Sequence, residues 1–223
     1  MEKKEHNLLI NVDELTWGFP DAQSYLFDKF NFSLYKWDFT ILMWESWSGK
    51  TVFSKFLTWK IPAPKKTIFY KMTDMSTLKW TDLQLYRRKM WIIFQDSKLL
   101  KNMSVKDNII YPLRIYWLWE STIEVKYDRV KKDLNIAPFE ARDIHKMSGW
   151  ERQLVNIARA VIHDPEFIIA DEPTWNLDRK NTQKVADIFI DLNKKGKTIL
   201  LITHDIHLLN YIKKQVPINL FKL

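Results

Sequence analysis

The sequence predicts an α/β protein built on a mainly parallel β-sheet, and three observations lead to this prediction. Short apolar runs alternate with segments of helical periodicity, which is typical of a parallel sheet with helices on its faces. One apolar run, residues 39–43, leads directly into a loop and then into a helical pattern at residues 50–57. No low-complexity linker or repeat divides the 223 residues, so we expect a single domain.

The elements can be assigned in chain order. Residues 8–15 and 25–34 have the pattern of antiparallel strands joined through a turn around Gly18-Phe19-Pro20-Asp21. Buried strands are predicted at residues 39–43, 167–171 and 198–203. Between residues 94 and 171 the pattern becomes helical, and it predicts helices at residues 104–115, 122–134 and 149–162.

A phosphate-binding pattern follows the first buried strand. Residues 44–51, Trp-Glu-Ser-Trp-Ser-Gly-Lys-Thr, match GxxxxGK[ST] except at the first position, where Trp44 replaces glycine. Glycine is expected there because the backbone must turn tightly and bring its N–H groups against the phosphates. Lys50 can reach the β- and γ-phosphates, and the Thr51 hydroxyl can bind Mg²⁺ at the N-terminus of the following helix. The segment therefore predicts nucleotide binding.

Two later strands end at residues suited to phosphate chemistry. Asp171, at the end of the run 167–171, stands where such enzymes place the carboxylate that holds Mg²⁺, and Glu172 can act as general base toward water. An isolated acidic pair would be a strand-end turn, but the phosphate loop favours a catalytic role. His204 directly follows the run 198–203, and this position favours a catalytic histidine over a packed one.

Tryptophan stands at four positions where a nucleotide-binding ATPase requires glycine: Trp44, Trp47, Trp150 and Trp175, hereafter the motif tryptophans. The chain has 11 Trp and only 4 Gly, and their sum is close to the roughly 7% glycine of an average protein. Random placement would fill all four positions with odds on the order of 10⁻⁵. We therefore expect that the source reads UGA as glycine, as some bacteria with a reassigned code do. The alternative is a truly tryptophan-rich chain that has lost nucleotide binding.

Composition narrows the location and the partners. The formal net charge of +8 is compatible with a nucleic acid, an anionic membrane surface or a nucleotide, and does not choose among them. The basic pairs Lys131-Lys132 and Lys194-Lys195 are typical of solvated helix faces. Because the chain has no cysteine, no run of 18 apolar residues and no signal-peptide pattern, we expect a cytoplasmic protein without disulfides.

The heptad 147–153, Met-Ser-Gly-Trp-Glu-Arg-Gln, is similar to the LSGGxxQ signature of ABC-transporter ATPases, and essentially the whole chain resembles that family. The resemblance implies a P-loop fold with a mainly parallel sheet and an N-terminal antiparallel β subdomain. It also implies a helical subdomain at about residues 97–160, inserted in a single ABC ATPase domain that spans residues 1–223.

The resemblance implies roles for individual residues. Gln95 matches the glutamine that senses Mg²⁺ and the γ-phosphate. Asp178 matches the D-loop aspartate, and His204 matches the switch histidine. The expected catalytic residues are Glu172, His204 and Gln95. Phe19 matches the aromatic residue that stacks on adenine, with a place in the core as the alternative. The expected ATP-binding residues are Phe19, Trp44, Glu45, Ser46, Trp47, Ser48, Gly49, Lys50 and Thr51. The expected Mg²⁺ ligands are Thr51, Gln95 and Asp171. The signature residues expected to contact ATP on the opposite subunit are Ser148, Gly149, Trp150, Glu151 and Gln153.

The resemblance also implies the assembly. Subunits of this family pair head to tail around ATP and Mg²⁺, so we expect a homodimer that drives an integral membrane partner from the cytoplasmic face, without nucleic acid. Residues 94–100 and 170–178 resemble the group of FtsE cell-division, lipoprotein-release and macrolide-export ATPases, and residues 94–100 are nearest to FtsE, which works with the membrane protein FtsX.

Three alternatives are kept beside this interpretation. The first is a lipoprotein-release or macrolide-export ATPase with a permease partner. The second is a non-hydrolysing scaffold, which applies if the tryptophans are real. The third is a nucleic-acid-handling ATPase of the same superfamily, which would need long insertions or coiled-coil arms for which 223 residues leave no room.

Overall fold

The N-terminal strands form an antiparallel sheet in the computed structural model, which describes residues 7–19, 24–44 and 49–222. The strands pair in the order β2-β1-β4-β5. Their bounds are β1 (Leu8–Trp17), β2 (Phe27–Tyr35), β4 (Ile68–Tyr70) and β5 (Thr73–Asp74). The antiparallel pair predicted at residues 8–15 and 25–34 is confirmed, and part of its connecting turn lies outside the described residues.

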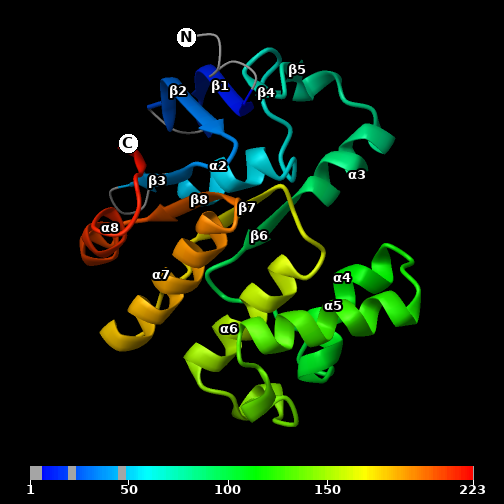
Figure 1. Cartoon of the computed structure of the whole chain (residues 1–223). Coiled ribbons are helices and arrows are strands. Elements are labelled where there is room, and N and C mark those ends of the chain that lie inside the picture. Colours follow the sequence, from blue (N-terminus) through cyan, green and yellow to red (C-terminus); the bar gives the residue numbers. More distant parts are fainter. Residues whose placement is uncertain (1–6, 20–23, 45–48, 223) are drawn as a thin grey trace.

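A second, parallel sheet lies at the centre of the molecule (Figure 1). Its strand order is β6-β7-β8-β3-β9, and every neighbouring pair is parallel. The bounds are β3 (Phe39–Met43), β6 (Met90–Ile93), β7 (Phe167–Asp171), β8 (Thr198–Thr203) and β9 (Asn219–Lys222). The three predicted buried strands are the central ones. The edge strands β6 and β9 were not predicted. A four-residue apolar run such as β6 cannot be distinguished from a buried helix segment by periodicity alone, and the residues of β9 are mostly exposed.

Helices cover both faces of the parallel sheet, which explains why all residues of β7 and β8 are buried. Ile169 and Leu200 belong to the core on the side of α2 (Lys50–Leu57) and the antiparallel sheet. Their neighbours Ile168 and Leu201 belong to the core on the side of α7 (Arg179–Lys194) and α8 (Ile206–Lys213). The alternation of side chains along each strand thus supplies two cores. The helix α3 (Trp80–Lys89) leads into β6.

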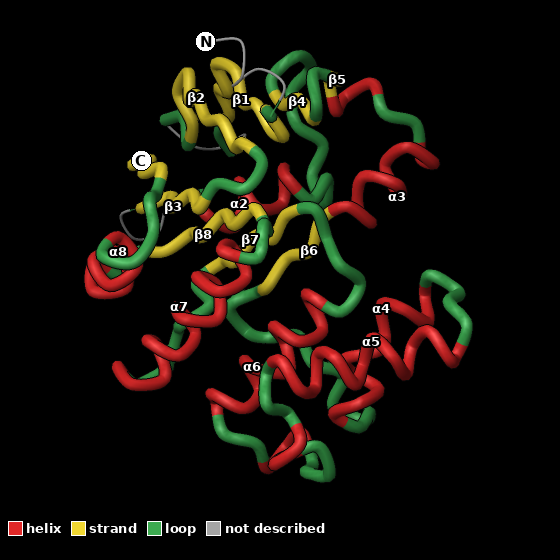
Figure 2. The backbone as a smooth tube through the Cα atoms, in the orientation of Figure 1, coloured by secondary structure: helices red, strands yellow, loops and turns green. Residues whose placement is uncertain are grey.

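Three helices form the lower part of the molecule in Figure 2, and α6 packs against β6. They are α4 (Val105–Ile115), α5 (Glu120–Asp133) and α6 (Gly149–Val161). Each lies within two residues of its predicted bounds, and together they enclose a third apolar core. The short 3₁₀ helices are η1 (Met75–Thr77), η2 (Ala137–Phe139) and η3 (Ile144–Lys146). Across the described ranges, none of the helices combines the length and apolarity needed to cross a bilayer.

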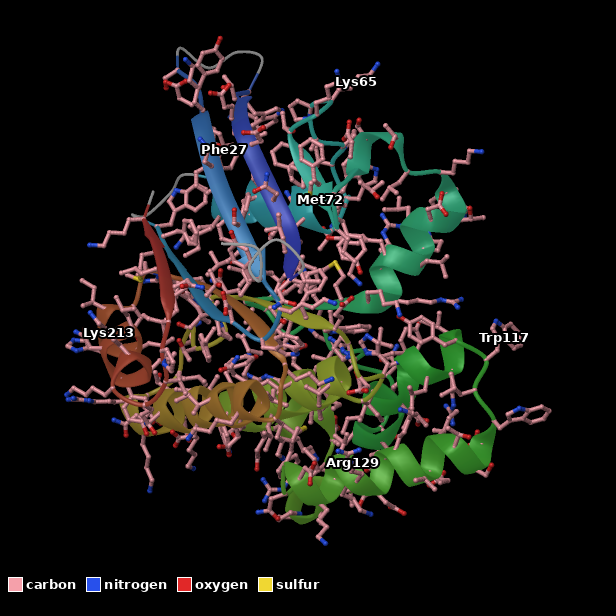
Figure 3. The ribbon with its side chains drawn as sticks, turned by 45° about the horizontal axis from the view of Figure 1, so that its top comes forward. Phe27, Lys65, Met72, Trp117, Arg129 and Lys213 are labelled. Atoms are coloured by element: carbon pink, nitrogen blue, oxygen red, sulfur yellow. The ribbon has the colours of Figure 1, made fainter. Side chains whose placement is uncertain are left out.

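The tryptophans lie in very different environments. Trp117 is 91% exposed, and Figure 3 shows its side chain pointing away from the protein beyond the end of α4. Other strongly exposed members are Trp37, Trp80 and Trp119. Trp44, in contrast, is 3% exposed. Because tryptophan is highly buried on average in folded proteins, the exposed positions are atypical for this residue.

Candidate functional site

The topology of the parallel sheet brings the predicted catalytic residues to one edge. Strands β7, β8 and β3 are neighbours and parallel, so their carboxyl ends lie together. Lys50 is the first residue of α2, shortly after β3. Asp171 is the last residue of β7 and Glu172 follows it, while His204 follows β8. We call these four residues the charged centre. Ligands of open α/β sheets bind at this edge.

Glu172 is the hub of the charged centre. Lys50 Nζ donates to Glu172 Oε1 at 2.5 Å, and His204 Nδ1 lies 2.6 Å from the same oxygen. The Thr203 hydroxyl donates to Oε2 at 3.1 Å, and the His204 backbone N–H donates to Oε1 at 3.2 Å. Glu172 is only 5% exposed, and these donors compensate the cost of burying its carboxylate.

Asp171 is buried beside Glu172 and has a different environment. Burial raises the pKa of its carboxyl to about 6, and the negative charge of Glu172 adds to this effect. The Ser54 hydroxyl, 3.3 Å from Asp171 Oδ2, opposes the rise in pKa. Ser54 lies one turn after Thr51 in α2, so the Asp171 carboxylate and the Thr51 hydroxyl belong to adjoining parts of the fold.

The oxygen donors of this region fit Mg²⁺. Within the described ranges, no three acidic or histidine side chains come together to hold a metal by themselves. Magnesium in nucleotide enzymes is usually held by one or two carboxylates together with substrate phosphates. A buried carboxylate at Asp171, next to the helix that carries Ser54 and Thr51, matches that requirement.

The indole of Trp44 lies close to the start of α2. Gly49 has φ 85°, and a Cβ at this position would lie 2.8 Å from the indole of Trp44. The Trp44 ring packs edge to face on Phe27 with centroids 5.5 Å apart, and it also contacts Phe53. The indole therefore fills core space beside Gly49 instead of facing solvent. The remaining predicted loop residues Glu45, Ser46, Trp47 and Ser48 lie outside the described residues.

The signature segment forms the first turn of α6. Ser148 caps this helix by accepting from the Glu151 backbone N–H at 3.2 Å, while the Ser148 N–H donates to the Glu151 carboxylate at 2.9 Å. Gly149 and Trp150 follow, and Lys184 of α7 lies over the Trp150 ring at 5.0 Å. Gln153 is buried. The contacts of Ser148 and Glu151 are local, and the structure does not bring them to the charged centre of the same chain.

Asp178 likewise serves as a helix cap in this structure. Its carboxylate accepts from the Asn181 backbone N–H at 2.8 Å at the start of α7. Between Glu172 and Asp178, the residues Trp175 and Asn176 border an open hollow of about 410 Å³ that also exposes His204. The ring centroids of Trp175 and His204 are 6.0 Å apart. The motif tryptophan Trp175 therefore lies beside the charged centre.

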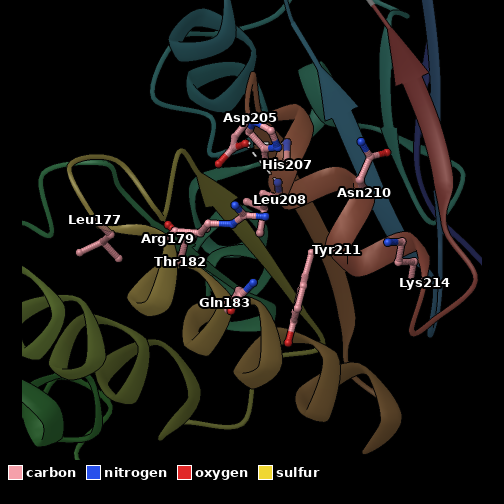
Figure 4. Close-up of a pocket in the computed structure, with 10 residues that line it drawn as sticks. All are labelled: Leu177, Arg179, Thr182, Gln183, Asp205, His207, Leu208, Asn210, Tyr211 and Lys214. Atoms are coloured by element: carbon pink, nitrogen blue, oxygen red, sulfur yellow. Dashed lines mark hydrogen bonds between the residues drawn. The ribbon is translucent and has the colours of Figure 1, made fainter.

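A larger hollow lies between α7 and α8 (Figure 4). It measures about 520 Å³ and contains Asp205, whose carboxylate caps α8 by accepting from the backbone N–H of His207 and Leu208. Neither Lys50 nor Glu172 lines it. The hollow at His204, and not this one, therefore adjoins the predicted chemistry.

Gln95 lies on the exposed loop that follows β6. Two residues of α6 hold this loop. Arg159 donates to the carbonyl oxygens of Ser97 at 2.6 Å and Lys98 at 2.9 Å, and Asn156 donates to the Phe94 carbonyl at 3.4 Å. Burial lowers the pKa of Arg159 to about 10. The sequence interpretation missed Arg159 and Asn156, although two polar residues on the buried face of the predicted helix 149–162 could have indicated them.

Phe19 lies just after β1 and is 55% exposed, so the alternative of a core phenylalanine is wrong. Its ring packs edge to face on Trp17 at 4.9 Å, and Trp17 in turn packs on Phe56 of α2 at 5.4 Å. The aromatic group is thus tied to the helix that begins with Lys50. More than half of the Phe19 surface is exposed to solvent.

Comparison with known proteins places this geometry in a family. The sequence model of the family described as "ABC transporter" matches residues 27–175. The cell division ATP-binding protein FtsE of Bacillus subtilis (strain 168) is 30% identical over 209 residues, which cover 93% of this chain and 91% of that protein. The methionine import ATP-binding protein MetN of Halalkalibacterium halodurans is 32% identical over 177 residues, covering 78% of this chain and 52% of that protein.

Solved structures agree with the sequence comparisons. The dimeric bacterial ABC transporter cassette MJ0796 has a TM-score of 0.80 at 25% identity, covering 96% of this chain and 94% of that one. A structure of the same cassette in a post-hydrolysis state with ADP and Pi has a TM-score of 0.77 at 24% identity, with 91% of each chain covered. Since the family match spans more than half of the sequence, this chain belongs to the ABC transporter family of ATP-binding ATPase domains.

Proposed function

We propose that this chain is the ATP-hydrolysing subunit of an ABC-type membrane complex and that it works as a head-to-tail homodimer. The observation that carries the proposal is the convergence of Lys50 Nζ and His204 Nδ1 on one oxygen of Glu172, at 2.5 and 2.6 Å. A scaffold without hydrolysis has no physical need for this arrangement. The dimeric state of the MJ0796 cassette supports the dimer.

The contacts define what each side chain does during hydrolysis. In the described geometry the Lys50 ammonium is paired with Glu172. When this ammonium moves to the β- and γ-phosphates of ATP, Glu172 Oε1 becomes free to accept a proton from the attacking water. A bond then forms between the water oxygen and the γ-phosphorus, and the bond to the ADP oxygen breaks. His204 stays close enough to contact the γ-phosphate, and Thr203 holds the second oxygen of Glu172.

Magnesium is assigned to Asp171, Thr51 and Gln95. When bound, Mg²⁺ neutralises charge on the phosphates and so favours transfer of the γ-phosphoryl group. Burial raises the pKa of the Asp171 carboxyl to about 6, and a cation beside this carboxylate would favour its charged form.

The signature segment completes the site of the opposite subunit. Ser148 and Gly149 stand at the N-terminus of α6, where backbone N–H groups and the helix dipole favour an anion. In the proposed dimer they contact the γ-phosphate bound by the partner, with Glu151, Gln153 and the glycine proposed for position 150 in the same turn. Asp178 lies at the N-terminus of α7 and would face the same interface. ATP would then hold the dimer together until it is hydrolysed.

The proposal includes glycine at the four motif tryptophans of the native protein. A glycine at position 44 would remove the indole that crowds Gly49 and would allow the tight turn of the phosphate loop. One observation favours the second candidate, a non-hydrolysing scaffold with true tryptophans. The Trp44 ring is accommodated among aromatic side chains of the core and is 3% exposed.

For the biological role we propose an FtsE-like subunit that lies on the cytoplasmic face of the membrane and binds an FtsX-type partner. The 30% identity with FtsE over most of both chains supports this role. The match to the import protein MetN keeps transport roles open as the alternative, together with lipoprotein release and macrolide export. Affinity purification from the native source distinguishes them. Recovery of an FtsX-like protein supports the FtsE-like role, and recovery of an export or import permease contradicts it.

Hydrolysis itself is tested on Glu172, in the chain with glycine at all four motif tryptophans, hereafter the glycine-restored chain. Glu172→Gln removes the proton acceptor but keeps the shape of the side chain. We expect kcat to fall about 10²–10⁴-fold while ATP binding is retained, so that ATP traps the variant as a dimer. The control is Glu124→Gln, which changes a surface carboxylate paired with Lys106. Equal hydrolysis by the Glu172→Gln and Glu124→Gln variants would overturn the proposed role.

A further inference from the structure

Two helices, α7 and α5, end in a turn that has glycine or asparagine at the position with left-handed backbone. After α7, Gly196 has φ 87°, its N–H donates to the Asn193 carbonyl at 2.8 Å, and the next N–H, of Lys197, donates to Leu192 at 3.0 Å. This pair of bonds defines the Schellman motif, whose left-handed position is usually glycine and sometimes asparagine. After α5, Asn135 occupies the equivalent position with φ 50°.

Two other helices end in the same motif with tryptophan at the left-handed position. After α2, Trp59 has φ 53°; its N–H donates to Phe56 at 2.9 Å, and the N–H of Lys60 donates to Lys55 at 2.8 Å. After α4, Trp117 has φ 57°. Its N–H donates to Arg114 at 3.1 Å, and the N–H of Leu118 donates to Leu113 at 3.3 Å. The hydrogen bonds are those of the Gly196 turn, so the backbone at Trp59 and Trp117 has the form that glycine favours.

A third tryptophan lies in a tight turn with the same requirement. Between β2 and β3, the Asp38 N–H donates to the Tyr35 carbonyl at 3.3 Å, and Trp37 is the third residue of this turn with φ 69°. Positive φ at the third position is the mark of a type II turn, where glycine is preferred. Trp37 is also 59% exposed.

Burial gives the indole at Trp117 little compensation for this backbone. A Cβ clashes with the following carbonyl in the left-handed region, and for a bulky residue positive φ is an outlier. Trp117 is 91% exposed and points into solvent (Figure 3). Nearby, Trp119 is 83% exposed and occupies the N-cap of α5 without a side-chain cap, a position where glycine ranks above large apolar residues.

We propose that the native protein has glycine at the positions of Trp37, Trp59 and Trp117. The replacement of glycine by tryptophan then results from how the codons of the whole gene are read, and not from the loss of one functional site. A chain that had lost nucleotide binding would accept tryptophan in its nucleotide motifs. It would have no reason to place tryptophan in a turn and at two helix ends that belong to none of those motifs. A single cause, a codon that the source reads as glycine, accounts for both sets of positions.

The stability of matched variants tests this proposal without any nucleotide. Trp59→Gly and Trp117→Gly are compared with Trp59→Ala and Trp117→Ala, because both changes remove the indole and only alanine keeps a Cβ. We expect each glycine variant to melt about 2–4 °C above its alanine counterpart. At Trp80, which begins the helix α3, glycine should give no such advantage over alanine. Equal melting temperatures of the glycine and alanine variants at both Trp59 and Trp117 would overturn the proposal. The glycine-restored chain serves as the background if the printed chain does not fold.

Peptide masses from the native source give a second, independent test. Trypsin releases residues 56–60, which contain Trp59, and residues 115–126, which contain Trp117 and Trp119. The proposal requires that the first peptide is lighter by one tryptophan-to-glycine difference, and the second by at least one. A tryptophan mass at either Trp59 or Trp117 would overturn it, even if ATP hydrolysis had been demonstrated.

Discussion

The charged centre and the phosphate loop lie at the same edge of the sheet, but they depart from the family pattern to different extents. In the charged centre, Lys50, Glu172 and His204 are present and joined by short contacts. In the loop, Trp44 replaces glycine and its indole crowds Gly49. The side chains that supply a chemical group are therefore retained, whereas the departures fall where the absence of a side chain is required. Random decay of a disused site would not make this distinction.

The largest predicted effect comes from restoring the loop. We expect the glycine-restored chain to hydrolyse ATP at least about 10³-fold faster than the printed chain, because backbone N–H groups can then approach the phosphates. The matched control carries alanine at the same four positions, which removes the indoles and keeps Cβ. Steady-state phosphate release measures all three chains. If the chain with tryptophan at the four motif positions hydrolysed ATP as fast as the glycine-restored chain, the proposed requirement for glycine in the phosphate loop would be contradicted.

A smaller effect concerns Asp171 of the charged centre, whose ionisation makes the unfolding free energy depend on pH. Because burial raises the pKa of Asp171 to about 6, above about 3.9 for an unfolded aspartate, the folded state binds the proton more tightly. Raising the pH from about 4 to 6 therefore favours unfolding and lowers the free energy of unfolding by about 2 kcal/mol at this residue. Urea unfolding of the parent chain and of Asp171→Asn at both pH values measures it. The variant should lack this loss, and identical pH dependence in both proteins would contradict the assignment.

The smallest effect concerns the loop that carries Gln95. Arg159→Met leaves the carbonyls of Ser97 and Lys98 without their donors, so we expect a loss of about 2 kcal/mol in unfolding free energy. Arg159→Lys should lie between the parent and the methionine variant, since it keeps the charge but not the two-pronged contact. Arg129→Met is the control, because the Arg129 side chain is 81% exposed. A loss no larger than that of Arg129→Met would show that Arg159 does not anchor the loop.

The sequence predicts the central part of the fold well, for a physical reason. Strands buried on both faces, such as 167–171 and 198–203, are nearly continuous apolar runs, and their bounds agree with the structure. The edge strands, β4 and the helices α3, α7 and α8 were not assigned from the sequence. The residues of β9 are mostly exposed, and Lys79 at the N-cap of α3 gives no capping signal.

The candidate site was partly accessible from the sequence. Lys50, Glu172 and His204 were predicted from motifs that follow strands, and the parallel topology brings them together. The contacts that support them were not predicted. Arg159 reaches its partners across about sixty residues of sequence, and Ser54 reaches Asp171 between two elements. Such contacts depend on tertiary packing, which leaves no local pattern in the chain.

The central claim is that the native phosphate loop contains glycine, and the mass of one peptide tests it most directly. The tryptic fragment from Trp37 to Lys50, isolated from the native source, contains Trp37, Trp44 and Trp47. We predict a mass lower than the printed sequence requires by three tryptophan-to-glycine differences. An unshifted mass would contradict the claim and would favour a non-hydrolysing scaffold.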